Sequence, residues 1–188
     1  MTEQKKAQEI NSVIQKIQQS VDTLSEVAMS SFDYDAFVKD KAYADTYTKS
    51  VQKSVLDFAN HTNGAVTAYL RYNPKYSNPT SGVFAQRPSL DQDLECLTPT
   101  DFSMYDEGDV EHVGWYYLPV QAGKAIWMSP YMNENVNIYM ISYVVPLQRI
   151  IQQLPRSLQR VCRRPEPTRQ VLWKVLGSWN KAPEIFTV

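Results

Sequence analysis

The first thirty residues carry the most regular pattern of apolar and polar positions in the chain. Apolar residues recur there every three or four positions, at Ile10, Ile14, Ile17, Val21, Leu24 and Ala28. No Gly or Pro interrupts residues 2–30, and the remaining positions are rich in Gln, Lys and Glu. This spacing predicts a long amphipathic helix with a near-heptad apolar row. The helix packs on its own domain through this row, or it uses the row as a dimer interface. The two interpretations are compatible if different faces of the helix make the two contacts.

A second helical pattern follows a break at residues 30–33, and then the period changes. Apolar residues between Phe37 and Phe58 keep roughly helical spacing, and Asn63-Gly64 is a stop signal. From Gly64 onward apolar and other residues alternate. In AVTAYLRYN, residues 65–73, Thr67, Tyr69 and Arg71 share one face. This alternation predicts a strand with a polar face that is free for binding.

The rest of the first 147 residues predicts an antiparallel sheet. Turn residues at 73–82 precede a short strand at 83–86, and residues 88–112 are acidic and irregular. Two further strands are predicted at Ala125–Met128 and Val136–Val145, joined by SPYMNEN. The aromatic stretch GWYYLPVQAGKAIWMSPYMNEN, residues 114–135, is interrupted by Gly and Pro and is not predicted to be a helix face. Two helices followed by antiparallel strands predict an α+β fold.

Composition limits the class of protein. A chain of 188 residues with 43% hydrophobic content can bury one core. The longest apolar run is far below the roughly 18 residues that cross a membrane. The N-terminal MTEQKKAQEI lacks the apolar region of a signal peptide. We therefore expect the chain to be soluble as given. If the protein works outside the cytoplasm, we expect its targeting segment or membrane anchor to be missing from this sequence.

The residues that catalysis requires are scarce. The only histidines are His61 and His112, so a Ser or Cys nucleophile would have few bases available. Cys96 and Cys162 have no metal-type spacing with them and are too few for a disulfide framework. A Gly-rich phosphate loop and a nucleophile elbow are also absent from the sequence. We expect no enzyme activity, no cofactor and no metal.

Charge divides the chain unevenly. Residues 1–147 hold 11 Lys and Arg against 18 Asp and Glu, whereas residues 148–188 hold 8 against 2, six of the eight being Arg. Three explanations of the C-terminal segment compete. Its reading frame differs from that of an ancestral receptor gene, or it is a basic amphipathic segment that touches a membrane surface or nucleic acid, or it packs as a non-standard helix. We expect three regions: a long helix at 1–34, a domain at 35–147 and a basic, poorly integrated tail at 148–188, which leaves the strand at 136–145 with an open edge.

The aromatic stretch supplies the candidate site. Tyr and Trp present an apolar body with one polar tip, which suits a concave site that orients a small ligand. The loop at 101–117 is expected to bring aromatic rings over a sheet face that bears Trp127 and Tyr131. The candidate ligand-binding residues are Trp115, Tyr116, Trp127, Tyr131 and Asn133, with Tyr69 and Arg71 from the earlier strand. The alternative is that these side chains are only core.

These segments together resemble a known family. Two N-terminal helices, AVTAYLRYNP, and HVGWYYLPVQAGKAIWMSPYMNENVNIYMISYVVPL resemble a Cache domain over about residues 5–147. Cache domains are the extracytoplasmic, PAS-like sensor modules of bacterial transmembrane receptors. The chain is most similar to those joined to diguanylate cyclase or histidine kinase output domains. The resemblance implies the small-molecule sensor of a diguanylate cyclase, a histidine kinase or a chemoreceptor. Its expected fold is a long helix that lies along a PAS-like antiparallel sheet.

Amino-acid-binding members of the family carry an Arg two residues before a Trp-Tyr pair, then a Tyr and an Asp. Trp115, Tyr116 and Tyr131 match, but Val113 and Asn133 stand at the two charged positions. The resemblance therefore implies a neutral or weakly polar ligand, and a membrane reached only through a missing anchor. No nucleic-acid partner is expected, because no aromatic residues lie among the arginines of the basic tail. A homodimer through the first helix is also expected. The alternative is a structural or dimerising module that binds no ligand.

Overall fold

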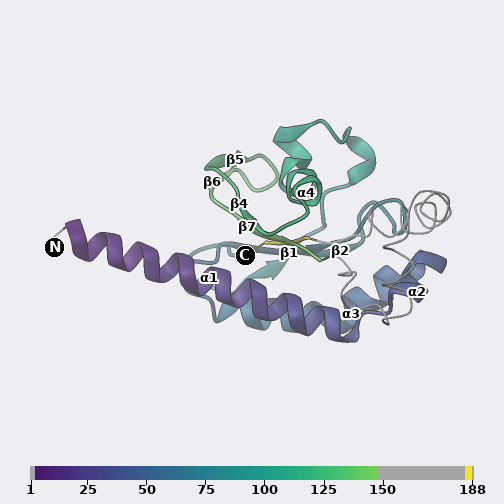
Figure 1. The fold of residues 1–188 in the computed structure, drawn as a ribbon, viewed down its shortest axis with the longest axis horizontal. Coiled ribbons are helices and arrows are strands. Elements are labelled where there is room, and N and C mark those ends of the chain that lie inside the picture. Colours follow the sequence, from purple (N-terminus) through teal and green to yellow (C-terminus); the bar gives the residue numbers. More distant parts are fainter. Residues whose placement is uncertain (1–2, 148–184, 188) are drawn as a thin grey trace, which may run out of the picture.

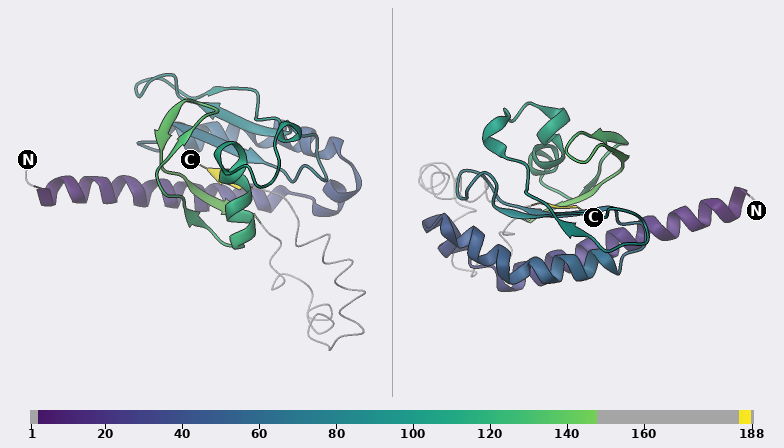
Figure 2. Two further views of the ribbon diagram at one scale, coloured as in Figure 1. Left: turned by 90° about the horizontal axis from the view of Figure 1, so that it is seen from above. Right: turned by 180° about the vertical axis from the view of Figure 1, so that it is seen from behind.

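The long first helix is confirmed. The computed structural model describes residues 3–147 and 185–187, and α1 runs without interruption over Glu3–Ser31. Its C-terminal half lies along the domain, whereas its first turns project beyond it (Figures 1 and 2). Ile10, in the projecting part, is 60% exposed, while Val21 and Leu24 are almost completely buried. The apolar row is thus core in its second half and exposed in its first.

This division corrects one expectation about the dimer. Ile17, Val21 and Leu24 pack into the core of their own domain, so they are not available to a second chain. Any pairing through the predicted row is restricted to the turns before Ile17.

The second predicted helix is divided in two. Helix α2 spans Tyr34–Lys39 and α3 spans Ala42–Asn60. The side chain of Asp33 caps α2 by accepting a hydrogen bond from the Ala36 amide at 2.9 Å. The predicted stop after α3 is confirmed, since Gly64 adopts a φ of +89° and turns the chain into the sheet.

The strands form one large sheet and one small hairpin. The large sheet has the order β3-β2-β1-β8-β7-β4 and its pairings are antiparallel. Its strands are β1 (Thr67–Arg71), β2 (Gly82–Gln86), β3 (Glu95–Cys96), β4 (Ile126–Trp127), β7 (Tyr143–Pro146) and β8 (Ile185–Thr187). The hairpin pairs β5 (Tyr131–Asn133) with β6 (Ile138–Met140). The α+β fold class, with a long helix along an antiparallel sheet, is confirmed.

Two layers cover the two faces of the large sheet. Helices α1 and α3 lie on one face, and α4 (Val110–Ala122) lies with the β5–β6 hairpin on the other (Figures 1 and 2). All five residues of β1 are consequently buried. The predicted alternation in β1 is right, but its polar face is covered: Ala68 and Leu70 face the helices, whereas Tyr69 packs under α4.

Two expectations about the last strands are wrong. The single strand predicted at 136–145 is divided into β6 and β7, and β6 turns back to pair with β5. The expected open edge is not found at β7, because β7 pairs with β4 on one side and with β8 on the other. The prediction of a poorly integrated basic tail concerns residues 148–188. Of these, the structure describes 185–187, which form β8 within the large sheet, and the rest lie outside the described part of the chain.

Candidate functional site

Helix α4 occupies the stretch that was not predicted to be helical. The Asp109 side chain caps it by accepting a hydrogen bond from the His112 amide, and Gly123 ends it at a φ of +64°. Pro119 lies inside the last turns of the helix, where it cannot donate a backbone hydrogen bond. The capping residues were the sequence signals for this helix. The density of aromatic rings obscured them.

The buried residues under α4 form the aromatic layer. They come from β1, β2, the short helix η1 (Phe102–Met104), α4 and β7: Tyr69, Phe84, Phe102, Val113, Trp115, Tyr116 and Val144. The Trp115 ring lies 4.6 Å from the Tyr69 ring and 5.8 Å from the Phe102 ring, measured between centroids. Its indole nitrogen donates to the His112 carbonyl oxygen at 2.7 Å. Trp115, Tyr116 and Tyr69 are therefore brought together as predicted, in a layer whose centre is closely packed.

The β5–β6 hairpin closes one side of the aromatic layer. The Tyr131 hydroxyl lies 3.0 Å from Ser142 Oγ, and its ring is half-buried against the layer. Burial raises the pKa of Tyr131, and hydrogen bonds to Ser142 and Asn133 partly oppose that shift. The Asn135 amide group donates to the His112 carbonyl oxygen at 3.4 Å, which joins the hairpin to the start of α4.

Asn133 is built into the turn of this hairpin. It is only 3% exposed, and its Oδ1 accepts a hydrogen bond from the Asn135 amide at 3.1 Å. Its Nδ2 lies 3.6 Å from the Met140 sulfur. The side chain thus holds the connection between β5 and β6, a role that the sequence pattern did not reveal.

The structure separates Trp127 from the other candidates. Trp127 packs against the core between the large sheet and helices α1 and α3, which we call the helix-side core. Its ring centroid is 5.0 Å from that of Tyr143. The two residues are direct partners in the β4–β7 pairing. The predicted sheet face shared by Trp127 and Tyr131 does not exist, because Trp127 and Tyr131 pack on opposite sides of the large sheet.

Arg71 is a buried clamp between loops. It is 1% exposed, and its guanidinium donates to the carbonyl oxygens of Ser81 at 3.1 Å, Pro79 at 2.7 Å and Thr100 at 2.7 Å. Burial lowers the pKa of Arg71 to about 10, an effect that Tyr116, Tyr69 and Asp101 oppose. The guanidinium carbon also lies 4.2 Å from the centre of the Phe102 ring. Arg71 therefore positions Phe102 beneath Trp115 and Tyr116.

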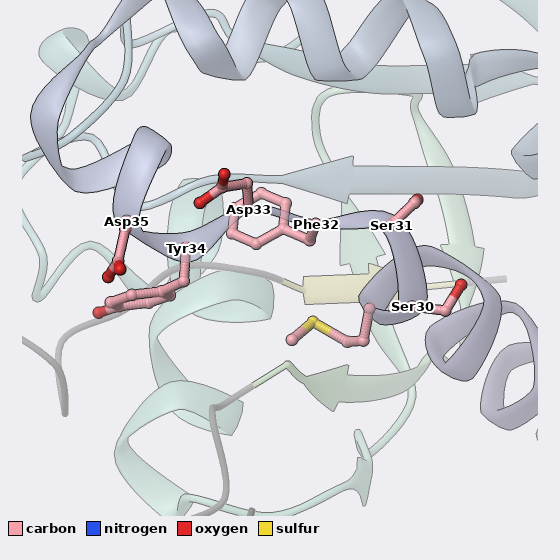
Figure 3. A pocket seen from close by; sticks show the side chains of 7 residues that line it. Ser30, Ser31, Phe32, Asp33, Tyr34 and Asp35 are labelled. Carbon is pink, nitrogen blue, oxygen red and sulfur yellow. The ribbon is translucent and has the colours of Figure 1, made fainter. Parts of the chain in front are cut away.

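A separate pocket lies at the corner between α1 and α2. Its volume is about 430 Å³, and residues 29–35 line it (Figure 3). Asp33 at its wall is the cap of α2, and its backbone amide donates to the Tyr43 hydroxyl at 2.6 Å. None of the seven predicted ligand-binding residues belongs to this lining.

Residues 3–147 and 185–187 contain neither a metal-binding cluster nor a membrane-spanning helix. No group of three or more His, Cys, Asp or Glu side chains there is arranged to hold a metal ion. No helix in this part combines the length and the apolar character needed to cross a membrane.

Comparisons with known proteins gave matches among solved structures alone. No family model and no curated protein matches the chain. Two structures of a Campylobacter jejuni chemoreceptor resemble it: the sensory domain of Tlp3 (CcmL), and the Tlp3 ligand-binding domain in complex with L-valine. Each is 12% identical with a TM-score of 0.44 and is matched over 74% of this chain. The chain spans about half the length of those domains, 49% and 48%.

Proposed function

We propose that this chain is the extracytoplasmic sensing domain of a bacterial transmembrane receptor and binds a small molecule between α4 and the β5–β6 hairpin. One observation carries the proposal. Trp115 and Tyr116 on α4 and Tyr131 on β5 pack into one layer on the same face of the sheet. These are also the residues that match the ligand-binding positions of Cache domains. A segment distant in sequence, β1, adds Tyr69 beneath them.

The ligand that suits this layer is neutral or weakly polar. Aromatic faces provide stacking surfaces, and the Tyr131 hydroxyl beside Ser142 provides a hydrogen-bonding group. At the two positions where amino-acid-binding Cache domains carry charges, this chain has Val113 and Asn133, and both are buried. Arg71 is held by three carbonyl oxygens. A zwitterionic amino acid would therefore find neither of its usual anchors.

The rim of the aromatic layer offers the route of entry. Six partly buried hydrophobic side chains pack against its buried centre: Tyr105, Tyr117, Val120, Met128, Tyr131 and Val136. The hydrogen bond from Asn135 to the His112 carbonyl oxygen is long, at 3.4 Å, and such bonds are weak. We propose that the ligand enters where this contact joins the hairpin to α4.

The receptor that contains this domain is proposed to be a diguanylate cyclase, a histidine kinase or a chemoreceptor, with the first two classes favoured. This part of the proposal rests on the sequence resemblance of HVGWYY and GKAIWMSPY to sensors of those two classes. The binding site is independent of which output domain follows.

A thermal-shift screen tests the proposed ligand class. The panel contains sugars, purines, amines, carboxylates and amino acids, each added to the full chain. A ligand at one hundred times its Kd stabilises the folded state by about 2.7 kcal/mol. We expect a rise in Tm of several degrees for a neutral sugar or purine and little for the amino acids. A panel without any stabilising compound, or one led by a zwitterionic amino acid, would contradict the proposal.

We also propose that the projecting turns of α1 pair with those of a second copy. Ile10 continues the buried apolar row past the end of the domain and is 60% exposed. The projecting turns of α1 are not packed against the domain, and a helical segment of this length gains little stability from its own hydrogen bonds. A second helix packed along the apolar row would therefore stabilise these turns.

Substitution on two faces of α1 tests this pairing. Ile10→Glu should shift sedimentation towards the monomer by about tenfold in the dimer dissociation constant, because it places a charge in the apolar contact. Val27→Glu is the control, since Val27 is 43% exposed on another face of the helix. A wild-type chain that sediments as a monomer at high concentration, or equal effects of the two variants, would exclude the pairing.

A further inference from the structure

Strand β7, like β1 and β2, contributes side chains to both faces of the large sheet. Tyr143 belongs to the helix-side core, whereas Val144 belongs to the aromatic layer. Adjacent residues of a strand point to opposite faces, so a shift of this backbone is felt on both sides of the sheet. Tyr143 is 5% exposed and Val144 is fully buried, which leaves neither side chain room to move independently.

On the sheet face that α4 covers, β7 adjoins the proposed ligand site. Ser142, the residue before β7, is fully buried, and its Oγ lies 3.0 Å from the hydroxyl of Tyr131. The Ser142 carbonyl oxygen accepts a hydrogen bond from the Met128 amide at 2.8 Å. Ser142 is therefore fixed between the hairpin and the end of β4.

On the opposite face, the next residue reaches α1. The Tyr143 hydroxyl donates to Asp22 Oδ1 at 3.0 Å, and Asp22 lies in the part of α1 that packs on the domain. The Tyr143 ring lies against Trp127. Burial and the neighbouring Asp22 carboxylate raise the pKa of Tyr143 to about 12. The phenol thus remains protonated, and able to donate to Asp22, throughout the neutral range.

We infer that Ser142 and Tyr143 connect the proposed ligand site to α1, so that a displacement of Tyr131 changes the hydrogen bond between Tyr143 and Asp22. The inference rests on the proposed function for its biological meaning, since Tyr131 is a proposed ligand contact. Its physical content is a coupling between two side chains on opposite faces of the sheet. The element that moves with the ligand would then be the long helix that projects from the domain (Figure 1).

Hydrogen exchange of the full chain tests the coupling without a ligand. The variants are Tyr131→Phe, Tyr143→Phe and the double substitution, and the measured quantity is the exchange rate of amides in residues 17–28 relative to those of α3. Loss of one hydrogen bond to a carboxylate should raise the α1 rate about fivefold in Tyr143→Phe. Tyr131→Phe should raise the rate of the same amides at least about twofold, and the double variant should match Tyr143→Phe alone.

The control is Tyr139→Phe, in the same hairpin, because Tyr139 is 68% exposed and its hydroxyl should not affect α1. Normalising to α3 removes any global loss of stability. An unchanged α1 rate in Tyr131→Phe, or rates that multiply in the double variant, would overturn the inference. The ligand screen is independent, so a failed screen with a coupled pair contradicts the proposed function alone, whereas a bound ligand with an uncoupled pair contradicts this inference alone.

Discussion

Trp115→Ala is expected to destabilise the domain by about 3 to 5 kcal/mol, since removal of a buried aromatic ring leaves a cavity that neighbouring side chains fill only in part. The ring is 4% exposed, contacts Tyr69 and Phe102, and donates a hydrogen bond to the His112 carbonyl oxygen. The same substitution is expected to abolish binding of any ligand that the thermal-shift screen identifies. Urea unfolding followed by circular dichroism measures the stability effect.

Tyr139→Ala is the matched control for this loss. Tyr139 is an aromatic residue of the neighbouring hairpin and is 68% exposed. Its removal should change the free energy of unfolding by less than about 0.5 kcal/mol. Similar values for the two substitutions would show that the aromatic layer is not packed as described.

Gly82→Ala is expected to cost about 3 kcal/mol or more, because a side chain at this position meets the backbone of the neighbouring strand. The new Cβ would lie 2.2 Å from the Leu70 carbonyl oxygen and 2.9 Å from Arg71 Cδ. Gly82 also adopts a φ of +134°, which residues with a side chain rarely tolerate. Relief of the clash would force β1 and β2 apart and displace the Arg71 clamp.

The control for Gly82 is Gly108→Ala. A Cβ at Gly108 meets nothing within 4 Å, so this substitution should be neutral or slightly stabilising. Both variants are compared by urea unfolding. A Gly82→Ala variant within about 1 kcal/mol of the wild type would contradict the described approach of β1 and β2.

The parts of the fold that follow from local periodicity were predictable. The apolar row of α1 and the alternation in β1 both appear in the structure. What the pattern of β1 did not show was that a second layer covers its other face. Tyr69 and Arg71 belong to that face. Tyr69 is buried by α4, a segment more than thirty residues later, and Arg71 is buried by the loops that contain Pro79, Ser81 and Thr100.

Helix α4 was missed because its apolar residues do not occupy one stripe. The helix lies in a mostly apolar layer, and its sequence VEHVGWYYLPVQA places large residues all around its axis. The capping residues, Asp109 and Gly123, were the better evidence. Gly114 and Pro119 suggested an interruption, yet Gly114 is buried in the helix and Pro119 lies in its last turns.

The candidate site was predictable in its residue types and only partly in its geometry. Trp115, Tyr116, Tyr131 and Tyr69 do come together in the aromatic layer. Trp127 does not, because its face is set by pairing with Tyr143, a register that the sequence pattern did not fix. Arg71 and Asn133 are polar residues that serve the fold, through loop carbonyl oxygens and a hairpin turn respectively.

The most direct test of ligand binding between α4 and the hairpin is isothermal titration calorimetry of the best screening hit against three proteins: the wild type, Tyr131→Phe and Trp127→Phe. Tyr131 lies in the aromatic layer, whereas Trp127 is an aromatic residue on the opposite face of the sheet. Loss of one ligand hydrogen bond should weaken the Kd of Tyr131→Phe by about five- to tenfold, and Trp127→Phe should bind as tightly as the wild type. Unchanged affinity in Tyr131→Phe together with a loss in Trp127→Phe would contradict the proposed site.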